Sequence, residues 1–175
     1  MKEINGTIKE YIQSLLIAGI LAFIIITFVA QSFVVEGSSM EPNLHNGERL
    51  FVNKFIYRFK NPDRFDIVVL TPEIKTNVKF IKRVIGLPGE TIAIKNSKIY
   101  INGNQLKENN IIKEKMNMRE VYFPETKIPI DHVFVMGDNR NNSLDSTEFG
   151  PIAIDSISGE AFWIYWPLSE MKIIN

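Results

Sequence analysis

Two adjacent serines are the first side chains in this sequence whose setting could support chemistry. Ser38 and Ser39 lie in residues 37–42, Gly-Ser-Ser-Met-Glu-Pro, where the glycine permits a tight backbone and the proline stops a helix. A serine hydroxyl becomes an effective nucleophile only when a base removes its proton. Taken alone, the segment is equally a polar linker, so a base must come from elsewhere in the chain.

Lys82 is the candidate base. In a strand over residues 78–85, Val-Lys-Phe-Ile-Lys-Arg-Val-Ile, Lys82 shares a face with Val78, Phe80 and Val84. Apolar neighbours disfavour the ammonium form and lower the pKa of a lysine. An ordinary lysine is neutral in about one molecule in 2500 at pH 7, whereas catalytic lysines have a pKa of roughly 7–8. The pattern also suits a lysine that extends to water from a strand edge.

A third polar segment could orient such an amine. Residues 137–146, Gly-Asp-Asn-Arg-Asn-Asn-Ser-Leu-Asp-Ser, follow the apolar run 133–136. Asp, Asn and Ser side chains bond to nearby backbone in turns, so the structural interpretation is a β-turn with its own polar network. The same donors and acceptors could hold a lysine in place.

Short strands separated by turns are expected to position these three segments. Turn residues occur at 95–98 and at Asn102-Gly103. The candidate strands are residues 65–70, 78–85, 91–94, 98–101, 133–136 and 161–165. The pattern predicts a mainly β fold, an antiparallel and barrel-like sheet, with residues 107–120 as a polar surface excursion.

The first 35 residues differ from the rest of the chain. No charge occurs from residue 11 to residue 35, a length that exceeds the roughly 20 residues of a bilayer-spanning helix. We expect a short tail at 1–10, a transmembrane helix at 11–35 and a β-rich domain at 36–175. The alternative is a cleaved secretory signal, but residues 31–35 offer no clear small-x-small site. The lysines before the span weakly favour a cytoplasmic N-terminus.

Composition excludes several classes of protein. The 20 basic and 20 acidic residues give no net charge, which argues against a general nucleic-acid binder. Cysteine is absent, so disulfides and thiolate sites are excluded. A Ser-His-Asp triad would need His45 or His132, and we expect His132 to be a surface or hydrogen-bonded residue. Two histidines without an H-E-x-x-H pattern argue against zinc, and we expect no metal and no cofactor.

Four motifs in this order resemble the type I signal peptidases of the peptidase S26 family, membrane-anchored Ser/Lys endopeptidases. The nucleophile motif is Ser-Met-Glu-Pro at 39–42, and the general-base motif is Lys-Arg-Val-Ile-Gly-Leu-Pro-Gly at 82–89. The third motif runs from 137 to 146, and a fourth is Arg-Phe-Asp-Ile-Val-Val at 64–69. The resemblance covers about residues 10–165, and the single span with Gly37 is similar to Gram-positive members.

The resemblance implies a role for each site residue. Ser39 would be the nucleophile and Lys82 the general base, with Ser143 hydrogen-bonded to the lysine amine. The Ser39 backbone N–H would stabilise the oxyanion, because the position where some members have a second donor is Gly37. Asp145 would have a structural role.

Two residues depart from the family pattern. Phe65 stands at a position that is usually glycine, and Thr147 stands where an arginine is common. If Asp145 pairs with an arginine here, Arg83 or Arg140 must supply it.

The resemblance also implies the substrate and the location. The enzyme would cleave exported preproteins after small residues of the Ala-x-Ala type, through an acyl-enzyme. Its partners would be signal peptides and the lipid bilayer, with no nucleic acid. The protein would span the cell membrane once, with the catalytic domain on the extracytoplasmic side. Phe162, Trp163 and Trp166 could lie in the membrane interface, although a core position is the commoner fate of such a cluster.

Two other functions stay open. A self-cleaving repressor-type Ser/Lys protease would share the dyad, but it would need a DNA-binding segment in place of the apolar one. A catalytically silent, membrane-anchored β module could bind exported proteins without cutting them.

Overall fold

The structure is a computed structural model that describes residues 2–24, 30–72, 78–108 and 121–174. Its elements are α1 (Lys2–Ile24), β1 (Ala30–Val34), β2 (Arg49–Asn53), η2 (Ile56–Arg58), β3 (Ile67–Leu70), β4 (Phe80–Gly86), β5 (Thr91–Lys95), β6 (Lys98–Ile101), β7 (Asn104–Gln105), β8 (Phe123–Lys127), β9 (His132–Met136), α2 (Ser146–Phe149), β10 (Ile152–Ala153), η4 (Ile154–Ser156), β11 (Ile157–Trp166), η5 (Leu168–Glu170) and β12 (Lys172–Ile173).

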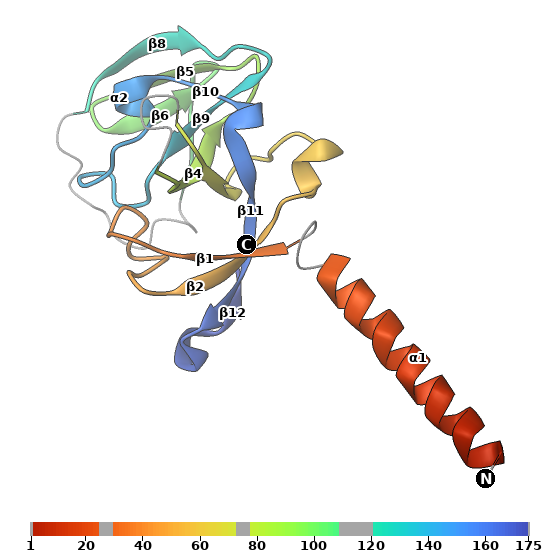
Figure 1. Ribbon diagram of the computed structural model, residues 1–175. Coiled ribbons are helices and arrows are strands. Elements are labelled where there is room, and N and C mark those ends of the chain that lie inside the picture. The colour runs from red at the N-terminus through yellow and green to blue at the C-terminus, as the bar shows by residue number, and fades with distance from the viewer. Residues whose placement is uncertain (1, 25–29, 73–77, 109–120, 175) are drawn as a thin grey trace.

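The strands of the described residues form two antiparallel sheets. The larger sheet has the order β1-β2-β11-β3-β4-β9-β10, with β12 paired to β11, and the smaller has the order β7-β6-β5-β8. Figure 1 shows the strands gathered in one body, from which α1 extends. The prediction of a mainly β, antiparallel fold is confirmed.

Both turns predicted within the smaller sheet are present. Asn96 and Ser97 connect β5 to β6 with φ angles of 49° and 59°. Asn102 and Gly103 connect β6 to β7 with φ angles of 49° and 78°. Two successive residues with positive φ twist the chain in the sense that a two-residue hairpin needs, and Asn and Gly tolerate that conformation best.

Strand β4 contributes to all three apolar clusters of the domain. Ile81 packs against a cluster built on β2, β3 and β11. Ile85 belongs to the cluster beneath the smaller sheet, and Val84 to a third cluster with β3 and β9. Since close packing fixes side-chain positions, the strand that carries Lys82 is held on several sides.

The predicted tail at 1–10 and helix at 11–35 are wrong at both boundaries, because α1 already begins at Lys2. Helix α1 ends at Ile24, and residues 30–34 form β1, which pairs with β2 from Ala30↔Asn53 to Val34↔Arg49. Pairing with β2 satisfies the backbone of this segment, so it does not continue the helix. In the parts of the chain that are described, no helix is both long and apolar enough to cross a membrane. Most of the predicted excursion, residues 109–120, lies outside the described residues.

Candidate active site

The structure brings Ser39 and Lys82 together. The Lys82 Nζ donates a hydrogen bond to the Ser39 Oγ at 2.8 Å and a second one to the Ile81 carbonyl at 3.1 Å. Lys82 is only 4% exposed, and Ser39 is half-buried. An amine and a hydroxyl at this separation can exchange a proton directly.

Burial changes the protonation of this amine. It lowers the pKa of Lys82 from 10.5 to about 8, because the ammonium form loses hydration, while the carboxylates of Asp145 and Asp138 act in the opposite direction. The Phe80 ring, whose centroid is 5.1 Å from the Lys82 Nζ, is part of the apolar surroundings. At a pKa of 8, about one molecule in ten holds a neutral lysine at pH 7.

The nucleophile segment is held by the loop that follows β9. The Asn139 N–H donates to the Ser39 carbonyl at 3.0 Å, and the Asn139 side-chain amide donates to the Ser38 carbonyl at 3.1 Å. The Asn142 amide donates to the Ser38 Oγ at 3.0 Å. These bonds fix the backbone on both sides of the Ser39 peptide.

Gly137 allows the two segments to approach this closely. A Cβ at position 137 would lie 2.5 Å from the Ser39 carbonyl oxygen and 2.3 Å from the Ser143 Oγ. Both distances are far below van der Waals contact, so a side chain would push the loop away from the nucleophile.

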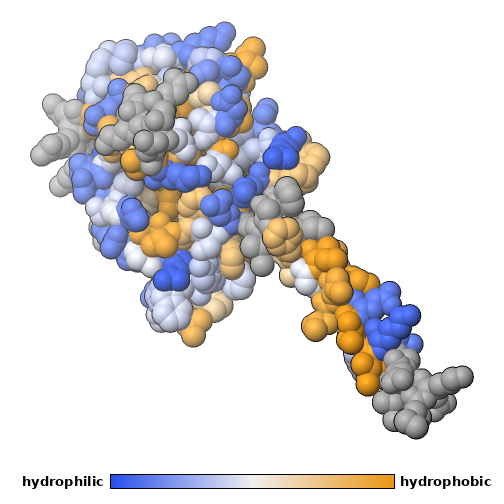
Figure 2. Space-filling model, viewed as in Figure 1, coloured by the Kyte–Doolittle hydropathy of each residue, from blue (hydrophilic) through white to orange (hydrophobic). Residues whose placement is uncertain are grey.

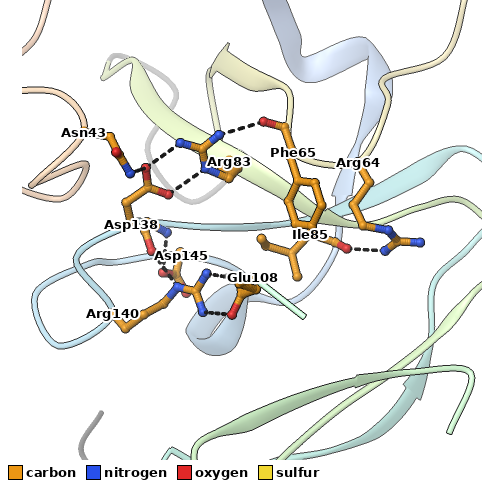
Figure 3. A network of polar contacts seen from close by, with 10 residues as sticks. Asn43, Arg64, Phe65, Arg83, Ile85, Glu108, Asp138, Arg140 and Asp145 are labelled. Carbon is orange, nitrogen blue, oxygen red and sulfur yellow. Dashed lines mark hydrogen bonds and ion pairs between the residues drawn. The ribbon is translucent and has the colours of Figure 1, made fainter. Parts of the chain in front are cut away.

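A buried ion pair is formed next to the dyad by Arg83, the residue that follows Lys82. The Arg83 Nε and Nη2 donate to the two carboxylate oxygens of Asp138 at 2.8 and 2.7 Å, and the Arg83 Nη1 donates to the Phe65 carbonyl at 2.9 Å (Figure 3). The Asn43 amide donates to the Asp138 Oδ2 at 2.8 Å. Arg83 and Asp138 are 3% and 0% exposed, and such a pair needs well-placed hydrogen bonds to offset its lost hydration.

Phe65 stands in a backbone conformation that favours glycine. Its φ angle is 78°, at the position where the resembling motif usually has glycine. The Phe65 N–H bonds to the Val84 carbonyl, and its ring packs against the cluster beneath the smaller sheet. These contacts, together with the Arg83 bond, hold a conformation that is costly for a residue with a side chain.

Asp145 takes its hydrogen bonds from backbone and threonine. It accepts from the Gly137 N–H at 2.9 Å and from the Thr147 N–H and hydroxyl at 3.1 and 2.8 Å, and so caps α2. Arg83 pairs with Asp138, while Arg140 donates to the Gly137 carbonyl and pairs with Glu108 (Figure 3). The hydroxyl of Thr147 therefore bonds to Asp145 at the position where the family commonly has an arginine.

The hydrogen bond predicted between Ser143 and Lys82 is not formed in the structure. Within the described residues, the Ser143 Oγ is buried and has no hydrogen-bond partner. The hydroxyl faces Gly137, which also accepts the close approach of the Ser39 carbonyl. Ser143 thus lies in the same loop as Asn139 and Asn142, which hold the nucleophile segment. Its role in orienting Lys82 stays a prediction.

A groove of about 710 Å³ opens onto the dyad. We call it the Ser39 groove, and its lining residues are Ser32–Glu36, Ser39, Met40, Val78–Lys82 and Leu144. One wall is β1, which ends the order of the larger sheet, and the other is the first part of β4. Pairing of β4 with β9 starts only at Arg83↔Met136, so residues 80–82 pair with β3 on one side alone among the described strands.

The backbone N–H of Ser39 is available at this groove. No described residue accepts a hydrogen bond from it, whereas the neighbouring Gly37 N–H donates to the Asn46 Oδ1 at 2.8 Å. A free N–H beside a nucleophile can stabilise a developing oxyanion.

Comparison with known proteins identifies the family. The family model described as "Signal peptidase, peptidase S26" matches residues 8–166, which is most of the chain. The chain belongs to the signal peptidase S26 family. Signal peptidase I P of Bacillus subtilis subsp. natto is 40% identical over 96% of this chain and 94% of its own length. Signal peptidase I T of Bacillus subtilis (strain 168) is 39% identical over 98% of this chain and 92% of its own length.

A solved structure is also similar to this member of the signal peptidase family. It is a signal peptidase I from Enterococcus faecalis V583, 33% identical, with a TM-score of 0.48. The match covers 58% of this chain and 97% of that chain.

Several residues in or beside the sequence motifs of this signal peptidase hold the site through contacts that the sequence alone did not predict. Asn43, Gly137 and Asn139 all lie in or beside the quoted motifs, but their roles depend on contacts across the fold. His132 lies at the start of β9 with its Nδ1 at 2.7 Å from the Asp131 carboxylate. Among the residues with described positions, no three His, Asp or Glu side chains could hold a metal ion.

Proposed function

We propose that this protein is a serine endopeptidase that removes signal peptides from exported preproteins, with Ser39 as nucleophile and Lys82 as general base. The observation that carries the proposal is the 2.8 Å hydrogen bond between the two side chains, both of which line an open groove. The lowered pKa of Lys82 supports it, because a base must be neutral before it can accept a proton.

The reaction starts with neutral Lys82. Its Nζ takes the proton of the Ser39 hydroxyl as the Oγ attacks the scissile carbonyl carbon, and the Ser39 N–H donates to the resulting oxyanion. The protonated lysine then gives its proton to the leaving amine, and an acyl-enzyme remains. Lys82, neutral again, activates a water molecule that releases the signal peptide, and Ser39 regains its proton.

An extended substrate fits the shape of the Ser39 groove. A polypeptide placed between β1 and residues 80–82 could pair with either strand, which aligns its backbone without regard to sequence. Selection for small residues at the first and third positions before the cut would then be steric, because larger side chains would meet the groove walls. The relatives named signal peptidase I support this substrate class.

A membrane-anchored position is part of the proposal. The side chains of residues 8–23 in α1 are all exposed, including Leu15 at 76% and Phe23 at 67%. Figure 2 shows hydrophobic side chains along much of this helix. Apolar residues without a protein partner are stable in lipid. We place residues 1–10 in the cytoplasm and the domain from residue 36 onward on the extracytoplasmic side.

Aromatic side chains on the outer face of the larger sheet support contact with the lipid surface. Phe51 stacks on Tyr165 with ring centroids 4.4 Å apart and contacts Trp163 at 5.8 Å. Trp166 and Leu168 follow at the end of β11 and are 50% and 67% exposed. Aromatic residues of this kind favour the membrane interface.

The test is cleavage of a preprotein with an Ala-x-Ala site by the full chain in detergent or vesicles. We expect Ser39→Ala and Lys82→Ala to lose cleavage by at least about a thousandfold. Their controls, Ser169→Ala and Lys98→Ala, change exposed residues and should cleave normally. Cleavage by Ser39→Ala would contradict the proposal. Binding without cleavage by the unaltered chain would instead support the silent module, and cleavage of the chain itself alone would support a self-processing protease.

A further inference from the structure

Asn43 connects the nucleophile segment to the ion pair beneath the dyad. Its amide nitrogen donates to the Asp138 Oδ2 at 2.8 Å, although 95 residues separate the two positions in the chain. Asp138 receives two more bonds from Arg83, the residue that follows Lys82 in β4 (Figure 3). The Asn43 side chain is therefore a direct link from the nucleophile segment to the ion pair that lies beside the base.

The nucleophile segment is also held by hydrogen bonds within its own turn and by packing against the core. The N–H groups of Asn43 and Leu44 both bond to the Met40 carbonyl, at 3.0 and 2.9 Å, and so close a tight turn directly after Ser39. Met40 and Leu44 are buried in the cluster of β2, β3 and β11. That packing holds the turn against a cluster that Ile81 of β4 also contacts. Asn43 adds a hydrogen bond to Asp138, which pairs with Arg83 of the same strand.

The loop that contains Asp138 also holds the other side of Ser39. The next residue, Asn139, donates its N–H to the Ser39 carbonyl. Because Asp138 is fully buried, its carboxylate orientation depends on the three hydrogen bonds that it accepts from Arg83 and Asn43. Loss of the Asn43 bond would leave one lone pair unsatisfied and free the turn to move relative to β4.

We propose that Asn43 is a positioning residue that holds the Ser39 hydroxyl in register with the Lys82 amine. This inference rests on the proposed function of the dyad. Asn43 does not touch the reacting atoms and acts through Asp138. Because hydrogen-bond distance between nucleophile and base is required in the transition state, a loosened turn lowers kcat more than it weakens substrate binding.

The first variant is Asn43→Ala. We expect kcat to fall about tenfold to a hundredfold with KM changed less than about twofold, because the Ser39 groove is left intact. The exposed residue Asn104, whose amide bonds to the Asn102 carbonyl, provides the matched control Asn104→Ala with unchanged kinetics. Circular dichroism and the melting temperature establish that each variant is folded at the assay temperature.

The second variant, Asn43→Asp, has the same shape but can donate only while protonated. Asp138 accepts the Asn43 bond and also pairs with Arg83, and the carboxylates of Asp138 and Asp145 both act on Lys82. A carboxyl beside the buried Asp138 keeps its proton at low pH, which restores a donor, and loses it as pH rises. We expect the ratio of its kcat to that of the parent to fall at least about tenfold between about pH 6 and pH 9.

Two results would overturn the inference. One is a kcat for Asn43→Ala within twofold of the parent. The other is a pH-independent ratio for Asn43→Asp, which would mean that the amide only fills space. Failure of the dyad itself is distinguishable, because Ser39→Ala would then retain cleavage. If Ser39→Ala is inactive while Asn43→Ala matches the parent, only the positioning role is wrong.

Discussion

Lys82 is an ionisable side chain whose burial disfavours its charged form. Its pKa is lowered from 10.5 to about 8, so the folded state binds fewer protons than the unfolded chain between those two pH values. Stability therefore rises with pH across this window, and the penalty for burying the ammonium is complete below pH 8. The difference corresponds to about 3 kcal/mol.

Replacement of this lysine should stabilise the protein while it destroys the proposed activity. We predict that Lys82→Met raises the free energy of unfolding at pH 7 by up to about 3 kcal/mol, because methionine fills similar space without a charge. The gain should shrink as pH approaches 10.5, the ordinary pKa of lysine. Urea unfolding of both proteins at several pH values measures it, and a destabilised variant at every pH would contradict the burial argument.

Gly137 is the residue at which a single methyl group should do most harm to the site. The added Cβ of Gly137→Ala would clash with the Ser39 carbonyl and the Ser143 hydroxyl. We predict a loss of about 1–3 kcal/mol in stability and of at least about tenfold in kcat. Gly19→Ala is the control, since a Cβ at that position meets nothing within 4 Å. A Gly137→Ala enzyme with parental kcat would show that the loop can retreat without disturbing Ser39.

At the scale of elements, β1 and β4 are the strands between which a substrate would lie. Both offer backbone along the Ser39 groove, and residues 80–82 pair with β3 alone among the described strands. We predict that N-methylation of a peptide substrate's amides near the scissile bond lowers kcat/KM by about tenfold or more for amides that bond to these strands. A scan of singly methylated peptides should alternate between sensitive and tolerant positions with a period of two. Uniform tolerance would contradict strand addition.

The strands and turns were predictable because their residue types have strong local conformational preferences. Asn96-Ser97 and Asn102-Gly103 suit a positive φ, and the β-branched run at 67–69 suits a buried strand. The end of α1 was not predictable from apolarity alone, since residues 30–34 become a strand by pairing with β2. Strand pairing is a long-range contact, which no local pattern encodes.

Part of the candidate site was likewise predictable from the sequence, and part was not. The period of two placed Lys82 with Phe80 and Val84, and motif resemblance supplied Ser39. The structure adds the pairing of Arg83 with Asp138, a contact across 55 residues that residue types alone do not specify. The Thr147 hydroxyl on Asp145 could have been suspected from the missing arginine, because an acceptor that loses one donor needs another.

At the scale of the whole molecule, α1 and the β domain have separable tasks. The side chains of residues 8–23 are exposed and so add little packing to the domain, and the variant that tests this lacks residues 1–29. We predict that the truncated protein cleaves a short soluble peptide within about threefold of the parent rate but cleaves a vesicle-inserted preprotein at least about tenfold more slowly, because anchoring concentrates enzyme and substrate on one surface. Equal losses on both substrates would mean that α1 supports the catalytic domain itself.

Everything proposed for the whole molecule depends on the protonation of one amine beside one hydroxyl. NMR titration of the folded full chain with labelled lysine, and with Lys82→Arg to assign the resonance, measures that protonation directly. The account predicts a Lys82 midpoint near 8, with a chemical shift that responds to Ser39→Ala. A midpoint at the ordinary value of 10.5, unaffected by Ser39→Ala, would contradict it.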